Sequence, residues 1–435
     1  MSCALPGVWL VLRRQSLMGD ALSHTALPGI VISFLFGQWL LDSGWIGRAS
    51  LPVIEPLLLM TTATLVGIGT ALLAESLHRV ARVEATAALG VVFTSLFALG
   101  LLMVRLFADH TDLDPECVLL GQLELVIADT VPIGPYEVPW ACISNGSVLL
   151  INSLLIWLFF KELRLVAFDP ELATSLGINA RLLNYIMMAA TAWTLITAFR
   201  AVGSILVVGL LIVPAATGSL LTSRLRPLIG VAMVLAALSA VAGHLAAKTL
   251  PPLIFVPLGL TEVRDAGTAG MMAAAAGTFF LLALFLAPEK GLWARAYRRL
   301  RLALQIAGDD ILGNLFRREE AGPDGFVEKV ELSPAMQWLA PLYLRQLGYI
   351  GGGGSPLLTT TGRERARKVV RAHRLWESYM QKHFELPDDH LHATAHLVEH
   401  FLDEDLQERL FSELDSPQSD PHGRAIPESP APSAN

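Results

Sequence analysis

Histidine and carboxylate residues gather in two places in this chain, at spacings that are typical of metal-binding sites. Seven of the 11 histidines lie between residue 373 and the C-terminus. Near the N-terminus, Asp20 and His24 interrupt an otherwise apolar stretch. Imidazole and carboxylate donors without thiolate favour Mn²⁺, Fe²⁺ or Zn²⁺ over Cu⁺. The sequence therefore predicts divalent-metal chemistry at both ends of the chain, and no organic cofactor.

The C-terminal group is the denser of the two. His373 and Glu377 are four residues apart, which places them on one face of a helix. A second set, spaced i, i+4, i+7 and i+8, would also share one helix face and consists of His392, His396, Glu399 and His400. An exposed helix carries such residues by chance in some proteins. Four such residues on one helix face, together with the His373–Glu377 pair, favour a metal site over a chance arrangement.

Asp20 and His24 are also four residues apart, so a helix would present both on one face. Ionisable groups at membrane depth are costly and usually face a polar pathway. In this interpretation the pair is a half-site for a transported divalent metal. In the other interpretation the pair lies at a helix end and is exposed to the cytoplasm. The spacing alone favours neither.

These residues belong to a chain of 435 residues with the composition of a membrane protein. Hydrophobic residues make up 53% of it and charged residues 16%, whereas soluble domains contain about 25% charged residues. A helix needs roughly 20 apolar residues to cross a bilayer, and the candidate runs are 27–41, 54–74, 85–106, 144–160, 183–199, 202–222, 228–247 and 267–287. Strands of a membrane barrel do not produce such runs. We expect an all-α polytopic membrane protein with about eight or nine transmembrane helices, counting 1–12 as the end of a truncated first helix.

Basic residues set the expected orientation, because Lys and Arg concentrate in cytoplasmic loops. They follow every odd-numbered apolar segment and cluster again after Pro288. The N-terminus is therefore expected outside, and the tail after residue 288 in the cytoplasm. One outer loop is acidic and contains Asp109, His110, Asp112, Asp114 and Glu116. It is either a solvated loop or a surface that attracts cations or a solute-binding protein.

Residues 168–178 predict a short surface helix between two spans on the inner side. Asp169 suits the N-cap, Pro170 the first helical position and Gly177 the end of the helix. Such a helix either connects two spans or docks onto a cytoplasmic partner.

Three segments, in this order, resemble the permease subunits of ATP-binding-cassette importers for manganese, zinc and iron. They are LRRQSLMGDALSH (12–24), LVAFDPELATSLG (165–177) and VGSILVVGLLIVPAAT (202–217). The resemblance implies that Asp20 and His24 hold the metal in mid-pathway. It implies a coupling helix seated on the ATPase, marked by Phe168, Asp169, Pro170, Glu171 and Gly177. The implied partners are an ABC ATPase subunit, a second permease copy or paralogue, and an extracytoplasmic metal-binding protein, at a bacterial inner (plasma) membrane.

The tail resembles the diphtheria-toxin-repressor family of metal-dependent regulators. The matching segments are 361–377, 396–400 and 420–427, within a region of about 309–427. The resemblance implies that such tails pair, and a primary metal site formed by Asp310, His396, Glu399 and His400. It implies further ligand positions at His373, Glu377 and His392. The aspartate at 310 resembles the manganese-responsive branch, whereas the histidine at 396 departs from the Cys or Glu that is usual there.

The expected organisation has five parts: a transmembrane metal-permease domain (1–288), a basic linker (289–308), a degenerate winged-helix-like segment (309–362), metal-binding and dimerisation helices (363–415) and a disordered tail (416–435). The candidate DNA-reading helix, 333–345, contains one basic residue and an interior Pro341. DNA affinity depends mainly on basic residues that contact phosphate. DNA is therefore not favoured as a partner.

The sequence thus predicts a membrane permease subunit of an ATP-driven importer for manganese, zinc or iron, with a cytoplasmic metal-sensing domain. It contains no Walker motif, GxSxG or HExxH. No catalytic residues are therefore expected, and ATP hydrolysis falls to a separate chain. The alternative is a membrane-anchored, metal-dependent transcriptional regulator whose apolar part is only an anchor.

Overall fold

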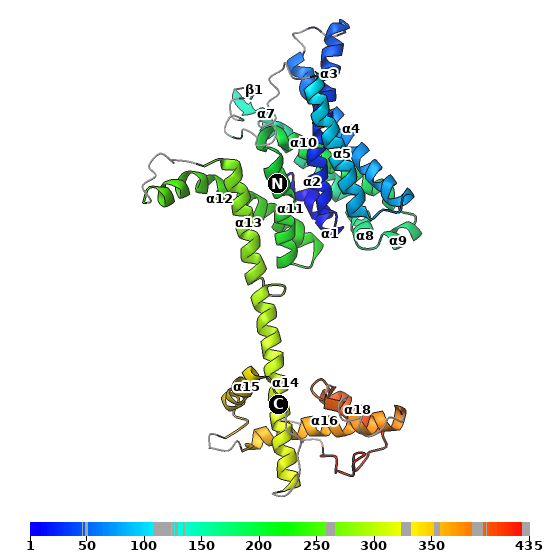
Figure 1. Ribbon diagram of the computed structural model, residues 1–435, viewed down its shortest axis with the longest axis vertical. Helices are drawn as coiled ribbons and strands as arrows, with labels where there is room; N and C mark the ends of the chain where they lie inside the picture. The colour runs from blue at the N-terminus through cyan, green and yellow to red at the C-terminus, as the bar shows by residue number, and fades with distance from the viewer. Residues whose placement is uncertain are drawn as a thin grey trace. The chain divides into compact units, whose positions relative to one another are not determined.

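The computed structural model describes residues 1–45, 47, 51–107, 123, 126, 129–133, 135–257, 266–322, 332–351, 357–384, 395–396 and 398–428. The chain forms two compact units, Met1–Ala294 and Arg295–Asn435. Within the described residues almost all regular structure is α-helical (Figure 1). Each unit has its own buried apolar core.

The first unit is a helical bundle with one small hairpin. Its helices are α1 (Ala4–Leu12), α2 (Ser16–His24), α3 (Ala26–Asp42), α4 (Leu51–Val80), α5 (Ala85–Phe107), α7 (Trp140–Leu158), α8 (Phe160–Phe168), α9 (Pro170–Ser175), α10 (Ala180–Val202), α11 (Ser204–Leu221), α12 (Leu225–Phe255) and α13 (Thr268–Leu286). The hairpin pairs β1 (Thr130–Ile133) with β2 (Tyr136–Pro139) in antiparallel register, with Val131 opposite Val138.

Seven helical segments among the described residues are long and apolar enough to cross a membrane. They are Ser16–Asp42, which joins α2 and α3, Leu57–Val80, Ala85–Phe107, Trp140–Leu158, Ala180–Phe199, Leu225–Ile254 and Thr268–Leu286. A shorter apolar helix covers Leu206–Leu221. Large apolar side chains such as Leu65, Leu154 and Trp157 are more than half exposed, as expected where lipid replaces water around a bundle. The prediction of an all-α polytopic membrane protein is confirmed.

α1 occupies the part of the chain that was expected to end a first span. It has nine residues, of which Ala4 to Leu10 are all buried. A Cβ atom on Gly7 would lie 1.8 Å from the carbonyl oxygen of Leu211 in α11. Glycine is therefore required for these two helices to approach so closely, and α1 lies within the bundle.

α2 and α3 form one apolar segment that is broken at Thr25. Pro28 lies in the first turn of α3, where the missing N–H removes no helical hydrogen bond. A Cβ atom on Gly29 would lie 2.6 Å from Cα of Ala63, so α3 and α4 are in close backbone contact. The apolar segment is therefore interrupted at Thr25, and α3 itself is continuous.

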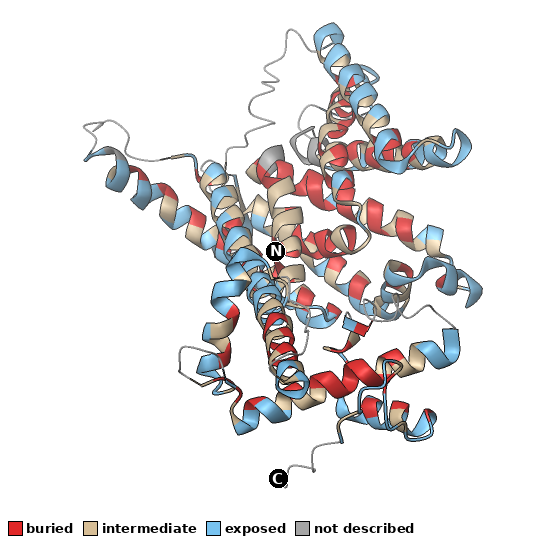
Figure 2. Cartoon of the chain, turned by 60° about the horizontal axis from the view of Figure 1, so that its bottom comes forward, coloured by how far each residue is buried: buried red, intermediate tan, exposed pale blue. Residues whose placement is uncertain are grey.

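The second unit is built mainly from longer helices. Those that the structure describes are α14 (Leu292–Ala321), which begins just before the unit boundary, α15 (Pro334–Gln346), α16 (Thr360–Phe384) and α18 (Glu404–Glu413). Buried residues concentrate in the middle of α16 (Figure 2). The core of this unit centres on Leu312, Leu344 and Ala366. α16 therefore organises the unit.

Two features at the start of this unit differ from the sequence-based expectation. Residues 289–308 were expected as a linker, but α14 runs without a break into the segment that contains Asp310. No glycine or proline lies between Leu292 and Ala307 to interrupt it. In the segment expected to be winged-helix-like (309–362), the described residues contain one isolated bridge, between Ile350 and Leu358, and residues 352–356 lie outside the described part of the chain.

The second part of the segment expected to form metal-binding and dimerisation helices (363–415) also differs from the expectation. Residues 385–394 and 397 lie outside the described residues, and α18 begins only at Glu404. Oδ1 of Asp403 accepts a hydrogen bond from the backbone N–H of Leu406 at 2.8 Å. This N-cap starts a new helix after the turn that contains Glu399 and His400.

Residues 416–428 form an ordered turn, although their Pro- and Ser-rich composition predicted disorder. Ser419 and Ala425 are bridged, and the backbone carbonyl of Pro427 accepts a hydrogen bond from Arg371 at 2.7 Å. Arg374 donates to the carbonyl oxygen of Ala425 at 2.5 Å. Both arginines are buried in α16 and need acceptors there, which this segment provides.

Candidate metal centres

Asp20 and His24 lie in the second half of α2, and their side chains meet. Nε2 of His24 is 3.5 Å from Oδ1 of Asp20, with the two side chains 34% and 45% exposed. The His24 ring stacks on Phe93 and meets Phe97 edge-on, with centroid distances of 6.1 and 5.5 Å. The expected shared helix face is present, and two rings of α5 orient the imidazole.

The other side of α2 packs into the bundle core. Met18, Ala21 and Leu22 are buried there, and Gly19 faces the side chain of Leu211 so closely that a Cβ would lie 2.3 Å away. The helix is therefore fixed along one face and presents its ionisable pair on another. Two donors of this kind are half of a tetrahedral metal site.

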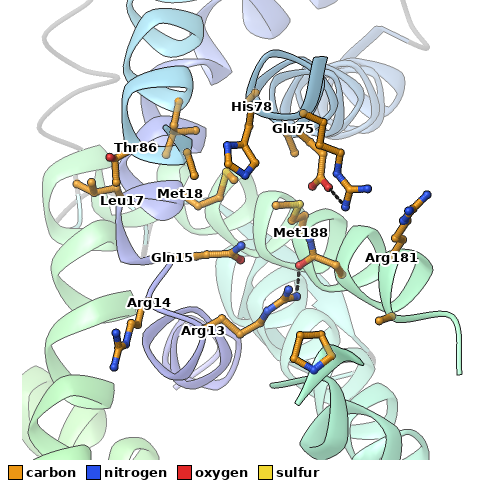
Figure 3. Close-up of a pocket in the computed structure, with 18 of the residues that line it drawn as sticks. Arg13, Arg14, Gln15, Leu17, Met18, Glu75, His78, Thr86, Arg181 and Met188 are labelled. Carbon is orange, nitrogen blue, oxygen red and sulfur yellow. Dashed lines mark hydrogen bonds and ion pairs between the residues drawn. The ribbon is translucent and has the colours of Figure 1, made fainter. Parts of the chain in front are cut away.

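A cavity of about 990 Å³ opens beside the N-terminal end of α2. Residues of the α1–α2 turn, the end of α4 and the starts of α5, α9 and α10 line it (Figure 3). Within it, Arg13 donates to the side-chain oxygen of Asn184, and Nη2 of Arg79 lies 2.5 Å from Oε1 of Glu75. The cavity thus joins the N-terminal turns of the Asp20 helix to the short helix α9.

α9 has the predicted caps. Oδ1 of Asp169 accepts the backbone N–H of Leu172 at 2.9 Å, Pro170 is the first helical residue, and Gly177 has a φ of 82° after the helix. Ala173 is buried against the bundle. The side of α9 that faces away from the bundle presents three exposed apolar side chains. These are Phe168, Leu172 and Leu176, which are 63%, 46% and 64% exposed. Exposed apolar side chains on a rigid short helix are typical of a docking surface.

The acidic outer loop (Asp109, His110, Asp112, Asp114 and Glu116) lies outside the described residues.

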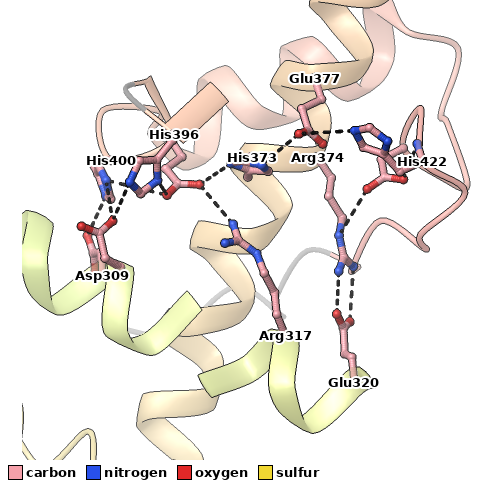
Figure 4. Close-up of polar contacts among 12 residues, drawn as sticks. Asp309, Arg317, Glu320, His373, Arg374, Glu377, His396, His400 and His422 are labelled. Atoms are coloured by element: carbon pink, nitrogen blue, oxygen red, sulfur yellow. Dashed lines mark hydrogen bonds and ion pairs between the residues drawn. The ribbon is translucent and has the colours of Figure 1, made fainter. Parts of the chain in front are cut away.

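In the second unit, four metal donors converge between α14 and residues 395–400. One ligand atom from each residue lies within 4.8 Å of all the others, and the residues are Asp310, His396, Glu399 and His400. Nε2 of His400 is 3.1 Å from Oδ1 of Asp310, and Nδ1 of His396 is 3.0 Å from Oε1 of Glu399. Figure 4 shows His396 and His400 turned toward α14. This is the one such group found among the described residues.

The local backbone explains how three of these donors meet. His396 lies in a short helical turn, and Glu399 and His400 follow in the turn that ends it. The N–H of Glu399 donates to the carbonyl of Ala395 at 2.9 Å. The expected stripe on one long helix is therefore replaced by a compact turn, and His392 lies outside the described residues.

Asp309, beside the predicted ligand Asp310, has a different role. Arg365 holds both of its carboxylate oxygens, with Nε to Oδ1 at 2.9 Å and Nη2 to Oδ2 at 2.6 Å. Oδ1 of Asp310, in contrast, is buried and faces imidazole nitrogens, with Nε2 of His400 at 3.1 Å and Nε2 of His396 at 3.7 Å. Imidazole and carboxylate donors this close together suit a divalent transition metal, so these four residues fit one.

His373 and Glu377 lie next to this cluster, and His373 contacts both Glu377 and Glu399, which belongs to the cluster. Nδ1 of His373 is 2.6 Å from Oε2 of Glu399, and Nε2 is 3.0 Å from Oε1 of Glu377. Arg317 approaches the same Glu399 oxygen at 3.5 Å. Glu399 therefore faces the four-donor cluster with Oε1 and faces His373 and Arg317 with Oε2.

The charges in the cluster shift its ionisation. Burial raises the pKa of Glu399, but the hydrogen bonds from His373 and His396 outweigh it and bring the pKa to about 2. Burial lowers the pKa of His400, but the carboxylates of Asp309 and Asp310 outweigh it and raise the pKa to about 9. At neutral pH the metal-free cluster is thus a protonated imidazole among carboxylates.

Sequence reasoning missed three residues around this cluster. Asp309 is the arginine-bound neighbour of Asp310, Arg317 approaches Glu399, and Nε2 of His422 is 4.0 Å from Oε1 of Glu377. Nothing in the sequence distinguishes Arg317 from the other arginines of α14. His422 had one, since it belongs to the quoted segment 420–427.

The fold and the sites define the class: a polytopic membrane protein with a metal-binding C-terminal unit. A family model described as the ABC 3 transport family matches residues 1–251, and a second, described as the iron dependent repressor, metal binding and dimerisation domain, matches residues 359–428. The chain belongs to the ABC 3 transport family. The predicted fusion of the two parts is confirmed.

Individual relatives agree with this assignment. The chain is 36% identical to the zinc transport system membrane protein TroD of Treponema pallidum (strain Nichols), over 70% of this chain and 76% of that protein. It is 34% identical to the manganese transport system membrane protein MntD of Bacillus subtilis (strain 168), over 71% and 95% respectively. A solved structure, PsaBC from Streptococcus pneumoniae in complex with Fab, matches at 25% identity with a TM-score of 0.51, over 67% of this chain and 88% of that chain.

Proposed function

We propose that this chain is the membrane subunit of an ATP-driven importer of divalent transition metals, manganese, zinc or iron. The observation that carries the proposal is the Asp20–His24 pair, half-buried on one face of a helix whose other face is fixed in the bundle core. The zinc and manganese transport proteins among its relatives support the substrate class. ATP hydrolysis is assigned to a separate ATPase chain.

In this proposal the metal passes Asp20 and His24 in the middle of its route. A carboxylate and an imidazole bind Mn²⁺, Fe²⁺ or Zn²⁺, and two protein donors leave further coordination positions for water or for other groups on the route. Weak, incomplete coordination suits transport, because the ion has to leave again. The cavity beside the start of α2 is the proposed inner mouth of the route.

The ATPase is proposed to dock on α9. The helix has caps at both ends and exposes Phe168, Leu172 and Leu176, and Glu171 and Thr174 line the cavity behind it. A partner that moves α9 would therefore also move a wall of the proposed inner mouth. A second permease copy or paralogue and an extracytoplasmic metal-binding protein complete the proposed assembly.

The C-terminal unit is proposed to lie in the cytoplasm and to sense imported metal at Asp310, His396, Glu399 and His400. Its match to a metal-binding and dimerisation domain supports this role. The alternative, a membrane-anchored regulator that binds DNA, has less support. α15 contains one basic residue, Arg345, and an interior Pro341, which is a poor phosphate-binding helix.

Proteoliposomes that contain the chain together with its ATPase test the proposal. ATP-dependent accumulation of Mn²⁺, Zn²⁺ or Fe²⁺ is expected, and it should disappear when the ATPase is inactive. A chain that assembles with the ATPase but moves none of the three ions would contradict it.

A further inference from the structure

The first half of α14 has two faces of different chemistry. Successive residues of an α-helix are turned by about 100°, and this spacing brings most apolar residues of 292–304 to one side. They are Leu292, Trp293, Ala296, Tyr297, Leu300, Ala303 and Leu304. The opposite side carries the arginines, which are Arg295, Arg298, Arg299 and Arg301. The segment 292–304 is therefore an amphipathic helix with a basic face, although Leu302 lies among the arginines.

The apolar face of this segment is largely exposed. Trp293 and Tyr297 are 70% and 66% exposed, and Leu292 and Leu300 are 41% and 45% exposed. The buried part of α14 begins only at Ala307. Several large apolar side chains gathered on one exposed face mark a surface that something apolar covers.

The turn before α14 keeps this segment close to the last apolar span. α13 ends at Leu286, and the N–H of Gly291 donates to the carbonyl oxygen of Ala287 at 2.9 Å. Lys290 donates to the carbonyl oxygen of Ser219, near the end of α11, at 2.6 Å. The headgroup zone of a bilayer is roughly 5–8 Å thick on each side. Because the turn is short and held to the bundle, α14 begins in or beside that zone.

We propose that residues 292–304 bind the anionic phospholipid headgroups of the leaflet that α13 reaches. Trp293 and Tyr297 would lie at the boundary of the apolar core, where such rings are enriched, and the arginines would contact phosphate. Helices with this division of residues lie in the plane of the interface, and a basic cluster directly after a span is typical of binding to anionic lipid. The inference goes beyond transport and metal sensing and depends on neither.

A second copy of the chain is the other candidate partner for the apolar face. Arg299 and Arg301 border this face on its two edges. In paired helices, residues at such edges usually form salt bridges across the contact, but residues 290–308 include no aspartate or glutamate. Two such helices packed face to face would therefore bring arginines together. Arginine binds phosphate through two parallel hydrogen bonds, so the charge favours an anionic lipid over a second copy.

The experiment places spin labels on the two faces of the full chain in lipid vesicles. Ala296→Cys puts a label on the apolar face, and Ala294→Cys puts one on the arginine side. In both, alanine replaces the cysteines of the sequence, which are Cys3, Cys117 and Cys142. The vesicles contain phosphatidylcholine alone or mixed with phosphatidylglycerol. Relaxation of the label by oxygen, which concentrates in lipid, is compared with relaxation by a water-soluble nickel complex.

With phosphatidylglycerol present, oxygen should relax the label at position 296 more strongly than the nickel complex does. The order should be reversed at position 294. This contrast between the two faces should be smaller in phosphatidylcholine alone. It should also decrease at high salt, which screens the attraction between the arginines and the lipid phosphates.

Removing the basic face should release the segment from the surface. One variant replaces three arginines by glutamine, and these are Arg295, Arg299 and Arg301. At about fivefold per arginine, binding to the anionic surface should weaken by about 100-fold, and the contrast between the two labels should be lost. The control removes as many positive charges from exposed arginines elsewhere in the second unit, which are Arg318, Arg345 and Arg409. It should keep the contrast.

A label at position 296 that the nickel complex reaches equally in both lipid mixtures would overturn the proposal. So would a label there that is shielded from both reagents in both mixtures, which is the result expected where protein covers the face. Equal behaviour of the arginine variant and its control would also overturn it. The salt comparison uses the unaltered arginines, so it decides the question even where the variant fails to fold. None of these results bears on metal uptake, which is measured separately.

Discussion

At the scale of single residues, the two candidate sites differ in how completely they surround a metal. Asp20 and His24 offer two donors with side chains 34–45% exposed. The C-terminal cluster offers four, with Glu399 and Asp310 at 4% and 9% exposure. A two-donor site releases its ion readily, whereas a four-donor site retains it. This difference suits passage at the first site and sensing at the second.

Removing either donor of the membrane pair should strongly reduce transport. We expect Asp20→Asn and His24→Gln each to lower ATP-dependent metal uptake by about tenfold or more, because loss of even an outer-shell group costs 10–100-fold in metal affinity. Uptake into proteoliposomes measures this. Asp42→Asn, the same change at the end of α3, is the control and should transport normally. Normal uptake by both Asp20→Asn and His24→Gln would refute the assignment.

Metal binding by the tail should strengthen as pH rises from 7 to about 9. In the metal-free tail the pKa of His400 is about 9, and that of His396 is raised above its usual value by its hydrogen bond to Glu399. His400 therefore carries a proton through most of this range, and a metal has to displace it. For one displaced proton the affinity rises about tenfold per pH unit.

Calorimetry at pH 7.5 in two buffers of different ionisation enthalpy counts the released protons, and at least one is expected. His400→Asn should reduce that number. An affinity that is flat between pH 7 and 9 would show that His400 is not a ligand. The pH range over which metal binding strengthens is therefore higher than expected for an ordinary histidine, which titrates near 6.5.

The sequence predicted the donors themselves but not their environment. Asp20 with His24, and His396 with Glu399 and His400, follow local spacings of three or four residues, which the sequence displays directly. The approach of Arg317 to Glu399 joins residues 82 positions apart, and no periodicity indicates such a contact. The break at Thr25 and the separate start of α18 at Glu404 also depend on tertiary packing and caps.

At the scale of elements, α9 is the feature whose local chemistry was most predictable. Asp169, Pro170 and Gly177 occupy the N-cap, the first turn and the left-handed position after the helix, as their types require. Its packing partners, α8 and α10, are its direct neighbours in the sequence, one before it and one after it. Local signals sufficed because nearly all of its stabilising contacts are local.

Charge reversal on α9 should uncouple the transporter. Glu171 is exposed on the first turn of the helix, so Glu171→Lys should leave the fold intact but weaken ATPase binding or metal-stimulated ATP hydrolysis. Co-purification and hydrolysis assays measure these two effects. Glu137→Lys, at an exposed position of β2, is the control. Equal coupling in Glu171→Lys and in the unaltered chain would count against α9 as the docking helix.

At the scale of the whole molecule, one chain contains both a transport domain and a metal-binding unit, which suggests feedback. If metal binds the unit more tightly in one state of the transporter, high internal metal will favour that state. Typical couplings of this kind are about 1–3 kcal/mol, or 5–150-fold in affinity. The ion that crosses the membrane would then limit its own uptake.

Removing the sensor should abolish that limit without affecting transport. Deletion of residues 323–435 keeps α14 whole and removes three of the four donors. The shortened chain should transport at the normal rate but no longer slow down when proteoliposomes are preloaded with metal. His396→Ala combined with His400→Ala should act in the same way in the full-length chain. If all versions respond equally to internal metal, the tail does not regulate transport.

The continuity of α14 decides where this protein can be divided. A soluble fragment that begins at Asp309 would place Asp310 in the first helical turn, where backbone N–H groups lack partners and helices fray. A fragment that begins at Arg295 keeps about 14 more residues, roughly 21 Å of helix, ahead of the ligand. The helix that follows the last apolar span therefore belongs to the metal-binding unit, since it carries the ligand Asp310 well inside its length. Exchange of such units between permeases should be made at residue 292 and not at 309.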